Sequence, residues 1–161
     1  MKRLALAVAV LAIATVAVAA ASSETKDTGA PTPMELGNFS VSLTVKDIKT
    51  SRAFYEKLGF KSIGGNEAQR WLILRNGPAI VGLFQGMFEK NIMTFNPGWT
   101  TDGTPLAAFE DVRDLQKRLE TSGITLTTKA DPASTGPASF TLSDPDGNMI
   151  LVDQHVPKPT K

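Results

Sequence analysis

Asp153 and His155 are the side chains whose types and spacing come nearest to metal or acid–base chemistry in this sequence. The stretch Met149–Gln154 is predicted to be a strand, so Leu151, Asp153 and His155 share one face if the strand persists. His155 is the only histidine in the chain. An imidazole beside a carboxylate can bind an ion or act as an acid–base pair. The alternative is a surface histidine at a strand end, near a solvated aspartate.

Three hydroxyl side chains, Ser40, Ser42 and Thr44, alternate with aliphatic residues near the start of the domain. A strand with this alternation has one apolar face and one hydroxyl face. The hydroxyl face suits a water-filled cleft better than a core. There the hydroxyls would either hydrogen-bond a ligand or face bound water.

Trp71, Ile73 and Arg75 also share one face of a predicted strand. A cavity at this face would offer an aromatic surface and a cation for an anionic ligand, whereas the alternative for Arg75 is an ordinary surface position. Trp99 lies in residues 87–101, which fit no simple period. Its indole is predicted either to contact a ligand or to pack within the connector between the two modules.

Two short helices must position these strands. Asp47 is placed to cap the first helix and Gly59 to end it, and Asp111 and Gly123 do the same for the second. The distance along the chain from Asp47 to Asp111 equals that from Gly59 to Gly123. Matched caps and stops indicate an internal duplication, although short amphipathic helices also resemble one another by chance.

The strands around the helices complete two similar modules. After the first helix, Phe60–Ile63, Trp71–Leu74 and Ala79–Gln85 are predicted strands, which gives the order β-α-β-β-β. After the second helix, strands are predicted at Ile124–Thr128, Ala138–Leu142 and Met149–Gln154. The sequence thus predicts an α+β domain over residues 37–156, with modules at about 37–86 and 102–156.

The first residues are typical of an export signal. Lys2 and Arg3 precede an alanine-rich apolar run that ends at Ala21, so residues 1–21 are predicted to be a signal peptide. An uncleaved membrane anchor is the alternative. Residues 22–36 are predicted to be a flexible linker. The protein is therefore expected to be exported, periplasmic or secreted, and to have no membrane contact after signal cleavage.

Composition limits the partners and the sources of stability. The chain has no cysteine, so no disulfide or lipid-modified cysteine can form. Its formal charge is +1, and removal of Lys2 and Arg3 leaves −1. A near-neutral domain with no basic cluster argues against nucleic acid as a partner.

Two segments, Leu43–Phe60 and Phe140–Gln154, resemble the vicinal oxygen chelate superfamily, which includes glyoxalase I, fosfomycin- and bleomycin-resistance proteins and extradiol dioxygenases. The resemblance implies two βαβββ modules that form an open, curled barrel of mixed β-sheet with helices outside and a cavity inside. It also implies a divalent cation held by His and Glu on strands that face the cavity.

The positions that correspond to those ligands carry other residues. The resemblance places the two first-strand ligands at Ser40 and Thr104 and a carboxylate at Leu151, while Gln85 stands where another carboxylate is expected. Hydroxyl, aliphatic and amide groups hold transition metals poorly. No metal or other cofactor is therefore expected. The alternative is a divalent metal with displaced ligands such as Asp153, His155 or Gln85.

Three functions follow as expectations. The first is metal-free binding of a small organic ligand on the concave sheet. The second is a glyoxalase-type lyase or isomerase, lactoylglutathione-lyase-like or dioxygenase-like in its chemistry. The third is a non-catalytic interaction protein. The family's barrel forms within one chain or across two, so a homodimer is a further expectation. The ligand-binding candidates are Ser40, Ser42, Thr44, Trp71, Arg75, Gln85, Trp99, Thr104 and Leu151.

Overall fold

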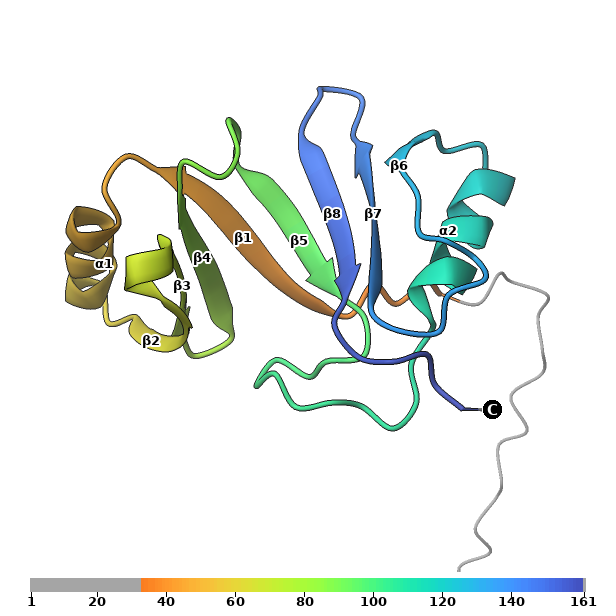
Figure 1. Ribbon diagram of the computed structural model, residues 1–161, viewed down its shortest axis with the longest axis horizontal. Helices are drawn as coiled ribbons and strands as arrows, with labels where there is room; N and C mark the ends of the chain where they lie inside the picture. The colour runs from red at the N-terminus through yellow and green to blue at the C-terminus, as the bar shows by residue number, and fades with distance from the viewer. Residues whose placement is uncertain (1–32, 161) are drawn as a thin grey trace, which may run out of the picture. The chain divides into compact units, whose positions relative to one another are not determined.

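Two βαβββ modules make up the part of the chain that the computed structural model describes, residues 33–160 (Figure 1). The first module contains β1 (Asn38–Val45), α1 (Ile48–Lys57), β2 (Lys61–Asn66), a short 3₁₀ turn η1 (Glu67–Gln69), β3 (Trp71–Asn76) and β4 (Ala79–Gln85). The second contains β5 (Ile92–Asn96), α2 (Val112–Thr121), β6 (Leu126–Thr128), β7 (Ala138–Ser143) and β8 (Met149–Gln154).

All the strands join one eight-stranded mixed sheet in the order β2-β3-β4-β1-β5-β8-β7-β6. Within each module the first strand pairs in parallel with the last, β1 with β4 and β5 with β8. The modules meet where β1 pairs antiparallel with β5. The predicted α+β fold is confirmed, because the sheet is built from two equivalent modules and stays open rather than closing into a barrel.

Alternation along the strands divides core from cavity. In the first module, Leu72, Leu74 and Leu83 pack against Ile48 of α1. In the second, α2 packs on buried residues of β6, β7 and β8, including Phe140. Residues between these positions face the opposite side of the sheet. Each helix therefore packs on its own module, α1 on β3 and β4 and α2 on β7 and β8. Figure 1 shows the two helices at opposite ends of the sheet.

The helix boundaries predicted from the duplication are confirmed. The Asp47 carboxylate accepts a hydrogen bond from the Thr50 backbone N–H at 2.7 Å, at the start of α1. Asp111 accepts from the Arg113 N–H at 3.0 Å, at the start of α2. Gly59 and Gly123 follow the two helices with φ of 89° and 83°, a conformation that glycine adopts without a steric penalty.

A second pair of caps was not predicted. The last residue of β4, Gln85, accepts a hydrogen bond from the Ile48 N–H of α1 at 3.0 Å through its side-chain oxygen. The last residue of β8, Gln154, accepts from the Val112 N–H of α2 at 2.8 Å in the same way. Each glutamine satisfies an N–H that has no partner within its helix. The duplication therefore extends to the link between each helix and its last strand.

Asp111, Arg113 and Gln154 form a buried polar network beneath α2, with exposed fractions of 2%, 5% and 0%. Arg113 Nη1 lies 3.0 Å from Asp111 Oδ1, and Gln154 Nε2 donates to Asp111 Oδ2 at 3.0 Å. Arg113 also donates to the Asp131 and Gly136 carbonyls and to the Ser134 hydroxyl. The network joins α2, β8 and the loop before β7.

The predicted start of the second module is wrong. Its first strand is β5, within residues 87–101 that were interpreted as a connector, and not a segment beginning near residue 102. A short connection, residues 46–47, separates β1 from α1, whereas residues 97–111 separate β5 from α2. The helix offset therefore does not apply to the first strands. Thr104 consequently lies in this loop and not on a strand.

The predicted signal peptide, residues 1–21, and residues 22–32 of the predicted linker lie outside the described residues. Within residues 33–160, no helix has the length and apolar character needed to cross a membrane.

Candidate functional site

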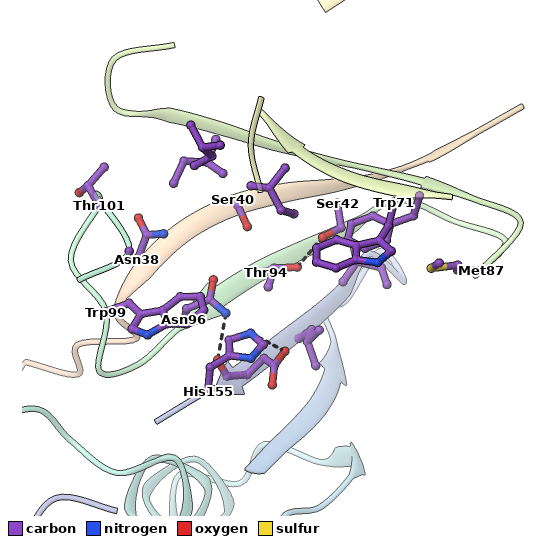
Figure 2. Close-up of a pocket in the computed structure, with 18 of the residues that line it drawn as sticks. Asn38, Ser40, Ser42, Trp71, Met87, Thr94, Asn96, Trp99, Thr101 and His155 are labelled. Carbon is purple, nitrogen blue, oxygen red and sulfur yellow. Dashed lines mark hydrogen bonds and ion pairs between the residues drawn. The ribbon is translucent and has the colours of Figure 1, made fainter. Parts of the chain in front are cut away.

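A cavity of about 690 Å³ lies on the face of the sheet that the helices leave uncovered. Volumes of about 300–1,000 Å³ are typical of small-molecule sites. Both modules and the β5–α2 loop contribute to its lining (Figure 2). Alternate side chains along each strand face the cavity. The strands supply these lining residues: Asn38, Ser40, Ser42, Ile63, Trp71, Ile73, Ile80, Phe84, Ile92, Thr94, Asn96, Leu151 and Asp153.

The floor of the cavity is polar and comes from the two strands that join the modules. Ser42 and Thr94 are buried, and their hydroxyl oxygens are 3.0 Å apart in a hydrogen bond across β1 and β5. Asn38 pairs with Asn96 farther along the same two strands, and Ser40 lies between, opposite Thr94. The floor thus presents hydroxyl and amide groups that can both donate and accept hydrogen bonds.

One wall of the cavity is apolar and belongs to the first module. Trp71 and Ile73 of β3 and Phe84 of β4 line it, and the Phe84 ring lies 5.2 Å from that of Phe88, centroid to centroid. Gly82 makes room for this arrangement, because a Cβ atom there would lie 2.5 Å from the Phe84 ring. The cavity is therefore amphipathic, with an aromatic wall beside a hydrogen-bonding floor.

Asp153, near the end of β8, and His155, directly after the strand, both line the cavity. Figure 2 shows His155 beside Trp99. His155 Nε2 lies 3.1 Å from Asp153 Oδ2. The imidazole stacks on the Trp99 indole, with centroids 4.4 Å apart and planes inclined by 14°. Asn96 Nδ2 donates to the Asp153 carbonyl at 2.9 Å. The hydrogen bond from His155 to the Asp153 carboxylate raises the pKa of His155 above its ordinary value, although partial burial opposes the shift.

The β5–α2 loop brings Trp99 to the cavity and closes one end of it. The loop folds back on itself, because Thr100 N–H donates to the Thr104 carbonyl at 2.9 Å and Leu106 N–H to the Gly98 carbonyl at 2.8 Å. Its tip reaches the first module, where the Arg75 guanidinium forms an ion pair with Asp102. The loop is thus held by its own hydrogen bonds and by an ion pair to β3.

Seven of the eleven side chains predicted for the site line this cavity: Ser40, Ser42, Trp71, Trp99, Leu151, Asp153 and His155. Thr44 instead donates to the Phe88 carbonyl at 2.9 Å. Arg75 is paired with Asp102, so it does not point into the cavity as a free cation. Gln85 lies on the opposite side of β4 and caps α1. Thr104 lies in the loop, outside the lining.

Residues of β5 were missed, although Thr94 and Asn96 lie at the centre of the floor. The alternation of Thr94 and Asn96 with Met93 and Phe95 was a possible strand signal. It was obscured by the neighbouring Asn91, Pro97 and Gly98, which are typical of loops.

A family model with the description Glyoxalase/Bleomycin resistance protein/Dioxygenase superfamily matches residues 34–152. The chain belongs to this superfamily. The match spans both modules and includes the strands that build the cavity. A search of curated proteins finds no match.

Three solved structures are similar to this domain at low sequence identity. A Legionella pneumophila protein named as an NAD-dependent benzaldehyde dehydrogenase is 16% identical, with a TM-score of 0.54 over 73% of this chain and 98% of that one. A Vibrio splendidus 12B01 superfamily member is 18% identical, with a TM-score of 0.49 over 72% and 97% of the two chains. The Mn(II)-bound glyoxalase from Novosphingobium aromaticivorans is 21% identical, with a TM-score of 0.47 over 76% of this chain and 40% of that one. These similarities concern the fold alone.

The residues at the superfamily's metal positions do not fit a divalent cation. The second-module counterpart of Ser40 is Ile92, and not Thr104. Thr94 pairs with Leu151 as Ser42 pairs with Gly82, and Leu151 and Gly82 each lie three residues before the glutamine that caps the helix of their module. Ser40, Ile92 and Leu151 thus place one hydroxyl and two aliphatic groups where imidazole and carboxylate are required. Within residues 33–160, no three His, Cys, Asp or Glu side chains gather in a group that could hold a metal.

The pKa of His155 can be measured directly because the chain has a single histidine. We expect the NMR titration midpoint of His155 to lie above 6.5, the ordinary value. In Asp153→Asn the midpoint should fall, because the carboxylate that stabilises the imidazolium is gone. This stabilisation of the fold is present below the ordinary pKa and is lost as the pH rises through the raised one.

The matched control for this titration is Asp146→Asn, which removes one carboxylate in the β7–β8 turn, before β8 begins. Its His155 midpoint should equal that of the unmodified protein. Equal midpoints in Asp153→Asn and the unmodified protein would contradict the assigned contact.

Proposed function

We propose that this domain binds a small organic molecule in its cavity and does so without a divalent metal. The observation that carries the proposal is the combination of an aromatic wall with a hydroxyl and amide floor in a cavity of about 690 Å³. Such a cavity can desolvate an apolar body and orient it through a few hydrogen bonds. The donor set at the superfamily's metal positions supports the metal-free part of the proposal.

A thermal-shift screen with small metabolites tests the binding function. A true ligand at about 100 times its Kd should stabilise the protein by about 2.7 kcal/mol. The stabilisation should be unchanged by a chelator. Ile73→Trp places an indole in the space beside the apolar wall and should abolish the stabilisation by the ligand. Ile124→Trp, at an exposed position outside the cavity lining, should leave that stabilisation intact.

Metal analysis of the purified protein tests the second part. A stoichiometric transition metal that is lost in Asp153→Ala or His155→Ala would overturn the metal-free proposal. Stabilisation that persists in Ile73→Trp would instead show that the ligand binds elsewhere.

A second candidate function is catalysis in the same cavity, as a glyoxalase-type lyase or isomerase. The observation that favours it is the Asp153–His155 pair, which faces the cavity and shares a hydrogen bond. The raised pKa of His155 increases the fraction of the imidazole that is protonated at neutral pH, and the protonated form can donate a proton. In that case His155→Gln should abolish turnover while retaining ligand binding. Turnover that is unchanged in this variant would exclude the pair as the acid–base group.

The same thermal-shift screen distinguishes small-molecule binding from the third function expected from the sequence, a surface that binds a partner protein. A protein whose cavity is unused gains no stability from small ligands.

We also infer that the protein is exported, from the basic start and apolar run of residues 1–21. Sequencing the N-terminus of the protein recovered from the cell envelope or medium tests this inference. A first residue close to Ser22 supports it, and a retained Met1 contradicts it.

A further inference from the structure

The cavity lining carries an unusual balance of charge for a site that would take an anion. Asp153 and His155 are the only ionisable side chains among its described lining residues. Their combined charge is zero when His155 is protonated and −1 when it is neutral. The lining therefore carries no net positive charge as long as the Asp153 carboxylate is ionised.

Arg75 was the cation expected to attract an anionic ligand, but its guanidinium is committed to Asp102 and to the Thr101 carbonyl at the mouth. An anion that entered the cavity would lose its hydration and meet the Asp153 carboxylate without a free cation to offset the cost. The charge distribution thus disfavours carboxylate and phosphate ligands.

The Asp153 carboxylate has one oxygen available for a ligand. His155 contacts Oδ2, and no side chain or backbone N–H within residues 33–160 donates to Oδ1. The carboxylate is about one-third exposed, at 30%, so it is accessible from the cavity. An ammonium group could donate to Oδ1 while the neutral imidazole keeps its N–H bond to Oδ2.

The aromatic side chains of the cavity support the same ligand class. Trp71, Phe84, Phe88 and Trp99 all line it, and the faces of indole and phenyl rings attract cations. The neighbouring hydroxyl and amide oxygens of the floor can accept the remaining ammonium hydrogens.

We propose that the ligand is a small cationic amphiphile, with an apolar, aromatic-sized body against the β3–β4 wall and one ammonium group at Asp153. This proposal rests on the proposed binding function and names the ligand class of that site.

The proposal requires that the protonated form of His155 weaken the binding of the ammonium ligand, because the imidazolium already offsets the charge of the Asp153 carboxylate. Asp153 is the titratable group in contact with His155 among the described residues, and the other ring packed on the imidazole, Trp99, does not titrate. Loss of the His155 proton leaves the carboxylate uncompensated. The affinity for an ammonium ligand should therefore rise as the pH is raised through the pKa of His155.

Isothermal titration calorimetry with three naphthalene probes tests the proposal on the purified protein. The probes are 1-naphthylmethylamine, 1-naphthalenemethanol and 1-naphthoate, which share one apolar body and differ in charge. At about pH 8 the amine should bind at least about tenfold more tightly than the alcohol, and the acid should bind most weakly. Between about pH 6 and 8, the amine affinity should rise and the alcohol affinity should stay constant.

Variants separate the charge effect from the fold. In Asp153→Asn, the amine affinity should fall to that of the alcohol. Asp146→Asn removes the same charge outside the cavity and should preserve the preference for the amine. The comparison of probes on the unmodified protein decides the matter even if Asp153→Asn does not fold.

The outcomes distinguish this proposal from the one on which it rests. Equal binding of the three probes, or tightest binding of 1-naphthoate, would overturn the cationic ligand and leave the binding function standing. If none of the three binds, the cavity does not accept an apolar body, and both proposals fail.

Discussion

Replacing Arg113 with alanine is expected to lower the free energy of unfolding by about 3–5 kcal/mol. The guanidinium is buried with the Asp111 carboxylate and also donates to groups in the loop before β7. Its removal leaves a buried carboxylate without its ionic partner, and the remaining bond from Gln154 does not neutralise that charge. Chemical denaturation, with the slope and midpoint fitted together, measures the loss.

Arg52→Ala is the matched control for this prediction. Arg52 forms ion pairs with Glu56 of its own helix and with Glu67, but its side chain is nearly half exposed and those of its partners are 44% and 32% exposed. Exposed pairs contribute about 0–1 kcal/mol, so this variant should be nearly as stable as the unmodified protein. Equal losses in the two arginine variants would show that burial of the Arg113 pair has no energetic consequence.

Replacing Gln154 with alanine is expected to lower the free energy of unfolding by about 3 kcal/mol. Its side chain accepts from the Val112 N–H and donates to both the Asp111 carboxylate and the Val156 carbonyl. All these groups lose a buried partner at once. Because Gln154 is the last residue of β8 and directly precedes His155, the NMR signal of His155 should also shift.

The duplication supplies the control for Gln154. Gln85 caps α1 through one partly buried hydrogen bond, so Gln85→Ala should lower the free energy of unfolding by only about 1 kcal/mol. Thermal and denaturant unfolding of the two variants would compare the modules directly. A larger loss in Gln85→Ala than in Gln154→Ala would contradict the importance assigned to the buried network.

The sequence predicted the helices well because their ends depend on local chemistry. Asp47 and Asp111 cap, and Gly59 and Gly123 terminate, through interactions with residues a few positions away. Such signals survive whatever the rest of the chain does. The arrangement of the two modules in one open sheet was likewise predicted from the resemblance.

The start of the second module could not be predicted from the same offset because loop length is not fixed by the fold. Lengthening a surface connection costs little free energy, and residues 97–111 replace what is a short link at residues 46–47 in the first module. Thr104 was therefore misplaced, and Thr94 was overlooked.

Within the site, the alternation of strands predicted which residues share a face, including Asp153 with His155. It did not predict that Gln85 would turn toward α1 or that Arg75 would meet Asp102, because both contacts join residues distant in sequence. The pairing of His155 with Trp99 also depends on the course of the loop. The ligand-binding role of these residues stays a prediction.

Neighbouring residues of β8 serve separate purposes, since Gln154 supports α2 while Asp153 and His155 face the cavity. A deletion or insertion of one residue in this strand would exchange the two sets. The side chains of β8 that face the cavity can therefore be changed by substitution, whereas a change in the length of the strand would disturb the cap of α2. The loop at residues 97–111 can change in length at little cost in free energy. Insertions or deletions in this loop would alter the part of the cavity lining near Trp99 and leave the sheet unchanged.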